Sequence, residues 1–212
     1  MSIRIALIDD HSMVRQALAS ILDAEADIEV VAQGGSRQEA RGILSDFEID
    51  VVVLDYHMPD GGALEVLSDL ADMDRDPNVL VLTVHDSVHY ALRTLDAGAH
   101  CFMIKSSAVE ELVEAIHAVQ RGQIYVTPKY RQEVETARER PRNEREGLSS
   151  LSDREFEILR ELAAGKSLKE TAYDLDIGVS TVSTYRSRIL KKLGFESSSE
   201  LIRFAVENGI VS

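Results

Sequence analysis

Cysteine and long apolar segments are the two features that this chain of 212 residues has least of. Cys101 is the only cysteine, so no disulfide can form within the chain, and a reducing cytoplasm is the expected location. No stretch approaches the roughly 20 consecutive apolar residues that a membrane span needs. The first apolar run, Ile5–Ile8, is too short for a secretion signal and is followed by two aspartates. The length favours one domain of ordinary size and a second, small one.

Basic residues are also scarce, but unevenly so. A formal net charge of −14 argues against nucleic-acid binding if it is treated as a property of the whole chain. Residues 1–121, however, contain 22 acidic and 8 basic residues, whereas residues 148–212 contain 10 and 9. The acidity therefore belongs to the first domain, and the second remains a candidate for binding DNA.

The segment between these two regions has almost no apolar side chains. Residues 131–147 include five arginines and five glutamates, and their only aliphatic residues are Val134 and Ala137. Such a segment cannot bury a core. We therefore predict that residues 122–147 form a linker, whose first half could be helical.

Polar side chains end several short apolar runs in the first domain. The run Val51–Leu54 is typical of a strand buried on both faces, and it ends at Asp55. If the strands are parallel, their ends meet at the edge where open α/β sheets bind ligands. Carboxylates gathered there need a cation, and an all-oxygen cluster suits Mg²⁺. A carboxylate beside Mg²⁺ can also attack phosphorus and become an aspartyl phosphate. The other residues that end such runs are Asp9, Asp10, Thr83 and Lys105.

Helical patterns alternate with these strands, which gives five β-α repeats. Alternation of this kind predicts a doubly wound parallel sheet with right-handed crossovers. The strand order 2-1-3-4-5 would place the strands that end at Asp10 and Asp55 side by side. The predicted helices follow Ser12 and cover Gln38–Phe47, Leu64–Leu70, Val88–Ala97 and Val109–Val119, and the second strand is Ile28–Ala32.

Residues 1–121 resemble the receiver domain of bacterial two-component response regulators. The resemblance implies a flavodoxin-like (βα)5 fold, Asp55 as the phosphoacceptor, and a sensor histidine kinase as the phosphoryl donor. It also implies that Phe102 is the switch aromatic, without the hydroxyl of the more usual tyrosine. Ala63 replaces a common glycine, and we expect the loop to turn at Gly61 and Gly62 instead. The resemblance rests on Asp9, Asp10, Asp55, Met58, Pro59, Thr83 and Lys105.

The same resemblance implies a magnesium site and a phosphoryl-sensing pair. Mg²⁺ would be bound by Asp9, Asp10, Asp55 and the backbone carbonyl of His57, and Thr83 and Lys105 would contact the phosphoryl group. The spacing of His57, His85, His89 and His100 matches no transition-metal ligand pattern, so we interpret them as loop or surface residues. In receivers, the positions of His57 and His85 flank the phosphoryl group and influence its lifetime.

Residues 148–212 read as four helices with a helix-turn-helix at their centre. Capping boxes at Ser152 and Ser167 predict the first two helices, and Ser180 is the expected N-cap of a third helix, Thr181–Leu193. That helix contains basic residues and no acidic one, so it could bind DNA phosphates while its hydroxyl side chains reach base edges. The alternative is a solvated basic face. The candidate DNA-binding residues are Thr181, Ser183, Thr184, Arg186, Ser187, Arg188, Lys191 and Lys192.

This region resembles the LuxR-type DNA-binding domain, from Leu151–Glu155 through Lys192–Gly194. The resemblance implies that Glu155 supports helix packing, that Thr181–Leu193 enters the major groove of promoter DNA, and that Ser199–Asn208 dimerises through Leu201, Ile202, Ala205 and Val206. Ser183 and Tyr185 stand where the family often has lysine and histidine. The two resemblances together suggest the NarL/FixJ-like subfamily.

A regulator of transcription that is controlled by phosphorylation is the leading interpretation, with RNA polymerase as a possible further partner. The chain would then be no enzyme, apart from phosphorylating itself from small donors and dephosphorylating itself. A magnesium phosphohydrolase with Asp55 as nucleophile is the alternative, but His57 stands where such enzymes usually have an acidic residue. A receiver that ignores phosphate and binds DNA constitutively is a third. A dinucleotide-binding domain is disfavoured, because no G-x-G-x-x-G follows the first strand.

Overall fold

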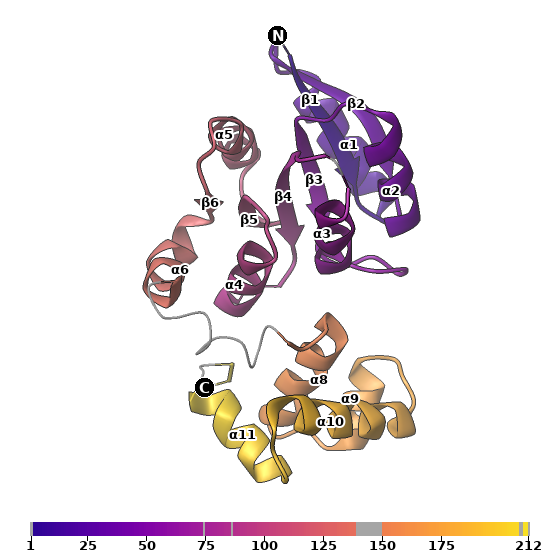
Figure 1. Cartoon of the computed structure of the whole chain (residues 1–212), viewed down its shortest axis with the longest axis vertical. Helices are drawn as coiled ribbons and strands as arrows, with labels where there is room; N and C mark the ends of the chain where they lie inside the picture. Colours follow the sequence, from indigo (N-terminus) through magenta and orange to yellow (C-terminus); the bar gives the residue numbers. More distant parts are fainter. Residues whose placement is uncertain (1, 74, 86, 139–149, 208–209, 212) are drawn as a thin grey trace. The chain divides into compact units, whose positions relative to one another are not determined.

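The computed structural model describes residues 2–73, 75–85, 87–138, 150–207 and 210–211 (Figure 1). The chain divides into two compact units, residues 1–138 and 139–212, which are described separately below. Within the described residues, no helix is both long and apolar enough to cross a bilayer.

Six parallel strands form the sheet of the first unit, in the order β2-β1-β3-β4-β5-β6. The predicted order 2-1-3-4-5 is confirmed, and a sixth strand extends it at one edge. β1 pairs with both β2 and β3, so the strands that precede Asp10 and end at Asp55 are neighbours, as expected. The strands are β1 (Ile3–Ile8), β2 (Ile28–Gly34), β3 (Val51–Asp55), β4 (Asn78–Thr83), β5 (Cys101–Ile104) and β6 (Tyr125–Val126).

Helices cover both faces of this sheet (Figure 1). One face packs on α1 and α5 in a core that includes Leu7, Leu22, Val53 and Ile116. Cys101 is part of the same core and is completely buried. Helices α2, α3 and α4 lie on the other side of the sheet (Figure 1). The helices between the strands are α1 (Ser12–Leu22), α2 (Arg37–Asp46), α3 (Ala63–Ala71), α4 (Val88–Asp96) and α5 (Val109–Gln120).

The segment predicted as a linker begins as part of the sheet unit. β6 pairs with β5, and it is followed by the 3-10 helix η1 (Pro128–Tyr130) and by α6 (Arg131–Arg138), which contacts α4 (Figure 1). Tyr130 and Val134 are buried. The compact unit therefore extends to residue 138, beyond the boundary at 121, because a few apolar side chains are enough to dock a helix on an existing core. The rest of the predicted linker, 139–147, lies outside the described residues.

The second unit consists of α8 (Asp153–Ala163), α9 (Leu168–Asp174), α10 (Val179–Leu193) and α11 (Ser198–Glu207). Both predicted capping boxes are present. The hydroxyls of Ser152 and Ser167 accept bonds from the backbone N–H groups of Glu155 and Glu170, and each glutamate side chain accepts a bond from the backbone N–H of its serine. Gly194 ends α10 in the left-handed conformation.

The start of α10, the predicted DNA-binding helix, differs from the prediction. The N-cap is Gly178 rather than Ser180, and the helix begins at Val179. Asp176, with φ of +51°, takes the left-handed position of the preceding turn, whereas Gly178 has a φ of −70° that any residue adopts. The sequence pointed to a serine because a serine is the usual cap, but the turn geometry places the cap two residues earlier.

Candidate functional site

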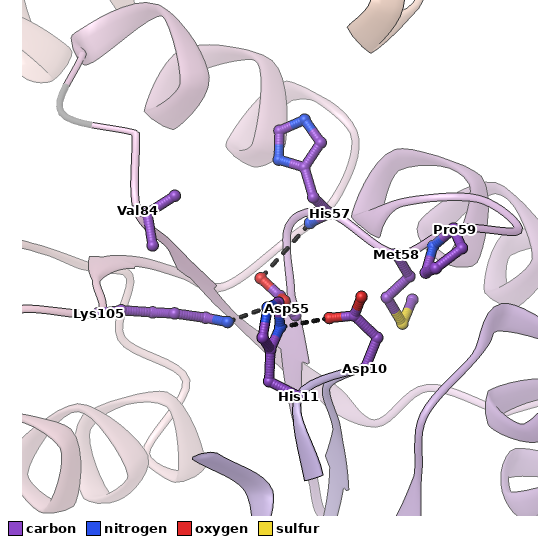
Figure 2. Close-up of a pocket in the computed structure, with 8 residues that line it drawn as sticks. All are labelled: Asp10, His11, Asp55, His57, Met58, Pro59, Val84 and Lys105. Carbon is purple, nitrogen blue, oxygen red and sulfur yellow. Dashed lines mark hydrogen bonds and ion pairs between the residues drawn. The ribbon is translucent and has the colours of Figure 1, made fainter. Parts of the chain in front are cut away.

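The acidic pocket forms where the parallel strands end (Figure 2). Asp9 and Asp10 directly follow β1, Asp55 is the last residue of β3, and Lys105 follows β5. The cavity has a volume of about 260 Å³. The structure thus brings these four predicted residues together. The residues that line the cavity are Asp10, His11, Asp55, His57, Met58, Pro59, Val84 and Lys105.

Lys105 pairs with two buried carboxylates at the same time. Its Nζ donates to Asp9 Oδ2 at 2.7 Å and to Asp55 Oδ2 at 2.8 Å. Asp9 and Asp55 are only 3% and 5% exposed, so water can stabilise their charges little. One ammonium group therefore serves two buried carboxylates, while Asp10 adds a third acidic group beside them.

The pKa of Asp55 shows that this compensation is incomplete. Burial raises the pKa of Asp55 above that of an ordinary aspartate, although the hydrogen bond and charge of Lys105 act in the opposite direction. For Lys105, burial lowers the pKa, but the hydrogen bonds and charges of Asp55 and Asp9 outweigh it, so its pKa is raised. Lys105 is therefore stabilised as an ammonium ion, whereas the negative charge of ionised Asp55 is only partly compensated.

The donor set fits a hard divalent cation. Ligand atoms of Asp9, Asp10, His11 and Asp55 all lie within 4.8 Å of one another. His11, which the sequence interpretation missed although it follows the acidic pair, binds Asp10 Oδ1 through Nδ1 at 2.6 Å. Carboxylate oxygens in a water-accessible pocket are the ligands that Mg²⁺ prefers. A divalent cation there would also supply the positive charge that the carboxylates lack.

The histidines beside the pocket turn their rings toward one another. The His57 ring points away from the Asp55 carboxylate (Figure 2), and its centroid lies 4.7 Å from that of His85. The His85 ring stacks on Tyr90 of α4 at 4.6 Å. The backbone of His57 stays near the site, with its N–H 3.4 Å from Asp55 Oδ1. His57 therefore offers its backbone to the pocket while its side chain packs with other rings.

Thr83 is the last residue of β4 and Phe102 belongs to β5, and neither lines the cavity. Thr83 is buried and its Oγ1 accepts a bond from the His85 N–H at 3.0 Å, while its carbonyl accepts one from the Lys105 N–H at 2.7 Å. Phe102 is completely buried and packs edge-on against Tyr130, with ring centroids 6.5 Å apart. Tyr130 was missed because it stands in the segment interpreted as a linker, although the apolar Tyr125 and Val126 just before it were a signal of further structure.

The candidate DNA-binding residues share one helix but not one environment. Thr184 and Ser187 are exposed, and each donates its hydroxyl to the carbonyl four residues earlier, at 3.0 and 3.1 Å. Lys192 instead donates to the buried Glu155 at 2.6 Å and to the Ser150 carbonyl at 3.0 Å. Thr181, Arg188 and Lys191 are exposed, and Ser183 and Arg186 are half-buried. Lys192 is thus part of the packing between α8 and α10.

Only two of the four predicted dimerisation residues are exposed. Leu201 and Ala205 are completely buried, because α11 packs on α8 within the unit. Ile202 and Val206 are 40% and 54% exposed. Of the four predicted residues, only Ile202 and Val206 can therefore meet a partner, and Asn208 lies outside the described residues.

A carboxylate pocket on a parallel sheet, followed by a separate helix-turn-helix, defines a receiver joined to a DNA-binding domain. Residues 5–117 match the response regulator receiver domain, and residues 149–205 match the bacterial regulatory proteins of the luxR family. The chain belongs to the two-component response regulators with a LuxR-type DNA-binding domain, and it is a transcriptional regulator. The expected resemblance is confirmed.

Relatives and solved structures match over nearly the whole chain. The transcriptional regulatory protein UhpA of Salmonella typhimurium is 37% identical over 199 residues, which cover 94% of this chain and 95% of UhpA. The crystal structure of the response regulator ChrA of a heme-sensing two-component system is 32% identical, with a TM-score of 0.52 and 99% of both chains covered. A complex of the response regulator RcsB with DNA shares the fold, with a TM-score of 0.61, 22% identity and coverage of 97% of this chain and 98% of that one.

Proposed function

We propose that Asp55 accepts a phosphoryl group from a sensor histidine kinase, and that phosphorylation promotes dimerisation and promoter binding. The observation that supports this most directly is the buried Asp55 carboxylate, which opens on a cavity and lacks full compensation of its charge. In the reaction, an Asp55 oxygen forms a bond to phosphorus while the bond from phosphorus to the donor's histidine nitrogen breaks. Small acyl phosphates can replace the kinase as donors, and water can later release the group.

Four oxygen ligands would bind Mg²⁺ here: the carboxylates of Asp9, Asp10 and Asp55 and the backbone carbonyl of His57. The ion supplies compensation for the negative charge of the phosphoryl group. Lys105 lies between Asp9 and Asp55 and can turn to a phosphoryl oxygen without leaving the pocket. Its secure positive charge suits that role.

The proposal is tested by measuring intact mass after incubation with an acyl phosphate and Mg²⁺. The parent protein should gain one phosphoryl group, and omission of Mg²⁺ or the change Asp55→Asn should prevent the gain. The control is Asp72→Asn, which removes the same charge at an exposed site outside the acidic pocket. An Asp55→Asn protein that still gains the group would show that another residue is phosphorylated. Rapid turnover of donor by the parent without regulation of DNA binding would favour a phosphohydrolase.

Thr83 and Phe102 are the proposed route from the phosphoryl group to the rest of the unit. Phe102 contacts Tyr130, and the Phe102 carbonyl accepts a bond from the Thr127 N–H at 3.1 Å, so the strand that carries the switch aromatic is joined to η1 and α6. A hydroxyl drawn to the phosphoryl group biases a two-state packing of these side chains. Thr83→Val should accept phosphate yet dimerise poorly. Equal phosphate-dependent dimerisation of variant and parent, measured by light scattering, would exclude the route.

In the second unit, we propose that α10 enters the major groove and that α11 dimerises. RcsB, which has the same fold, was solved on DNA. Thr181, Ser183, Thr184 and Ser187 are the candidates for base contacts, and Arg186, Arg188 and Lys191 for phosphate contacts. Ile202 and Val206 are the exposed residues through which two copies can pair, which would require an inverted repeat of half-sites.

A further inference from the structure

One aspartate outside the acidic pocket joins a wall of that pocket to a neighbouring helix. Asp60 stands in the loop between β3 and α3, directly after Pro59. Its Oδ1 accepts a bond from the backbone N–H of Arg37 at 2.8 Å, and its Oδ2 accepts one from Gln38 at 3.0 Å. These are the first two amides of α2, which have no acceptor within the helix. Asp60 therefore caps a helix that lies more than twenty residues away in the sequence.

The side chain of Arg37 adds a second link, between α2 and α3. Its guanidinium donates to Asp69 of α3 through Nε at 2.7 Å and Nη2 at 2.8 Å. Gly61 has a φ of +136°, and a Cβ at this position would lie 2.8 Å from Cδ of Arg37. The Arg37 side chain thus passes close to the loop backbone on its way to α3, and only glycine leaves room for it. This is the turn that the sequence predicted at Gly61 and Gly62.

Charge favours the same arrangement. Burial is the largest single influence and raises the pKa of Asp60, but the amides of Arg37 and Gln38 together with the charge of Arg37 outweigh it, so the pKa lies below that of an ordinary aspartate. The carboxylate is therefore ionised at neutral pH. A negative charge at the N-terminus of α2 is stabilised by the helix dipole.

The three residues that precede Asp60 are the ones that need a fixed position. His57, Met58 and Pro59 form one wall of the acidic pocket (Figure 2). Within the loop, the Ala63 N–H donates to the Tyr56 carbonyl at 3.0 Å and closes its base, whereas at its tip the Gly61 N–H donates to the Met58 carbonyl over a longer 3.3 Å. The two bonds from Asp60 are the ones that join the tip of this loop to a separate helix, so they fix the wall relative to α2.

We propose that Asp60 is a positioning residue for phosphorylation: by binding the start of α2, it holds the His57–Pro59 wall where a divalent cation and the phosphoryl donor are received. The inference rests on the proposed metal and phosphoryl site. It assigns to a residue that touches neither cation nor donor a share in the affinity of the pocket for both.

A matched pair of variants separates positioning from general stability. Ser36 caps the same end of α2, since its Oγ accepts a bond from the Glu39 N–H at 3.1 Å, but Ser36 has no part in the loop. Asp60→Ala and Ser36→Ala should both lower the melting temperature, because each removes a cap. Only Asp60→Ala should weaken the binding of Mn²⁺, used as a spectroscopic substitute for Mg²⁺, by about tenfold, as for residues that orient metal ligands elsewhere.

Hydrogen exchange provides a second measurement that does not depend on metal. Amides of residues 57–62 should exchange faster in Asp60→Ala than in Ser36→Ala, and Asp60→Asn, which keeps one acceptor oxygen, should be intermediate in both measurements. Equal Mn²⁺ affinity in Asp60→Ala and the parent would overturn the inference, and so would an equal loss in Ser36→Ala. If the parent itself binds no Mn²⁺, the proposed metal site fails, whereas unchanged exchange in Asp60→Ala defeats the positioning role alone.

Discussion

The two units use buried charge differently. In the receiver unit, the buried carboxylates of Asp9 and Asp55 line or adjoin a cavity, and the pKa of Asp55 is raised, so its ionised form is costly there. In the DNA-binding unit, the buried Glu155 is bound by Lys192 and by the Ser152 N–H, and burial is outweighed so that its pKa is lowered. A buried carboxylate that is poorly compensated indicates a site for a ligand, whereas a well-compensated one indicates packing.

Removal of the Lys192 side chain has the largest expected effect on stability of the substitutions that test this comparison. Lys192→Ala should destabilise the second unit by about 2 kcal/mol, less than for a fully buried pair because Lys192 is partly exposed. The pKa of Glu155 is lowered, so this contribution is present above the ordinary glutamate pKa and is lost as the pH falls through the lowered value. Urea unfolding at two pH values measures both.

Lys191→Ala is the matched control for Lys192. Its side chain is exposed, so stability should change little, while the slope of log K against log salt for DNA should fall by roughly one unit. If Lys192→Ala lowers the salt slope and leaves stability unchanged, the distinction between packing and binding charges breaks down for this helix.

Thr184 probes specificity at an exposed position. Thr184→Ala should weaken binding to the true site by about 1–3 kcal/mol and leave the salt slope unchanged, because the proposed base contact is lost and no phosphate contact is. Titration of specific and random DNA at several salt concentrations measures this. A loss of equal size on random DNA would assign Thr184 to the backbone.

Asp55→Asn should stabilise the receiver unit by about 1 kcal/mol at neutral pH while it abolishes phosphorylation. Because the folded-state pKa is raised, ionisation of Asp55 costs stability as the pH rises from the ordinary aspartate range through the raised value. Lys105 keeps Asp9 as a partner in the variant. The difference in melting temperature should shrink toward pH 4. A variant that melts lower than the parent at neutral pH would show that Lys105 compensates the charge of Asp55 fully.

Gly178→Ser has the smallest expected effect. A serine at this N-cap should stabilise α10 by a few tenths of a kcal/mol, since glycine is only slightly inferior as a cap. A Cβ there meets Thr181 Oγ1 at 3.5 Å and Ser180 Oγ at 3.6 Å, which are ordinary contacts. A lower melting temperature would mean that the cap is at Ser180 after all.

The residues that meet at the strand ends were predictable, because parallel strands bring their carboxyl ends to one edge of the sheet whatever the details of side-chain packing. Asp9, Asp55 and Lys105 had to meet once the strands were parallel, and they do. The partner of Lys192 was not predictable. The neighbouring sequence does not distinguish a lysine that is free to bind DNA from one that pairs with a glutamate 37 residues away. Asp60 was missed for the same reason, since its role depends on a contact with α2 rather than on periodicity. Tyr130 was missed because its segment was interpreted as a linker, so its contact with Phe102 was not expected.

Cys101 has a practical consequence for measuring the assembly. Its thiol is completely buried in the sheet, and burial raises its pKa far above the usual range, so it does not react as a thiolate at neutral pH. A cysteine introduced at the exposed Ser199 of α11, outside the proposed pairing residues Ile202 and Val206, would therefore be the one reactive thiol of the chain, without prior removal of the native one. A spin label on it would report the distance between two copies before and after phosphorylation, in the otherwise unaltered protein.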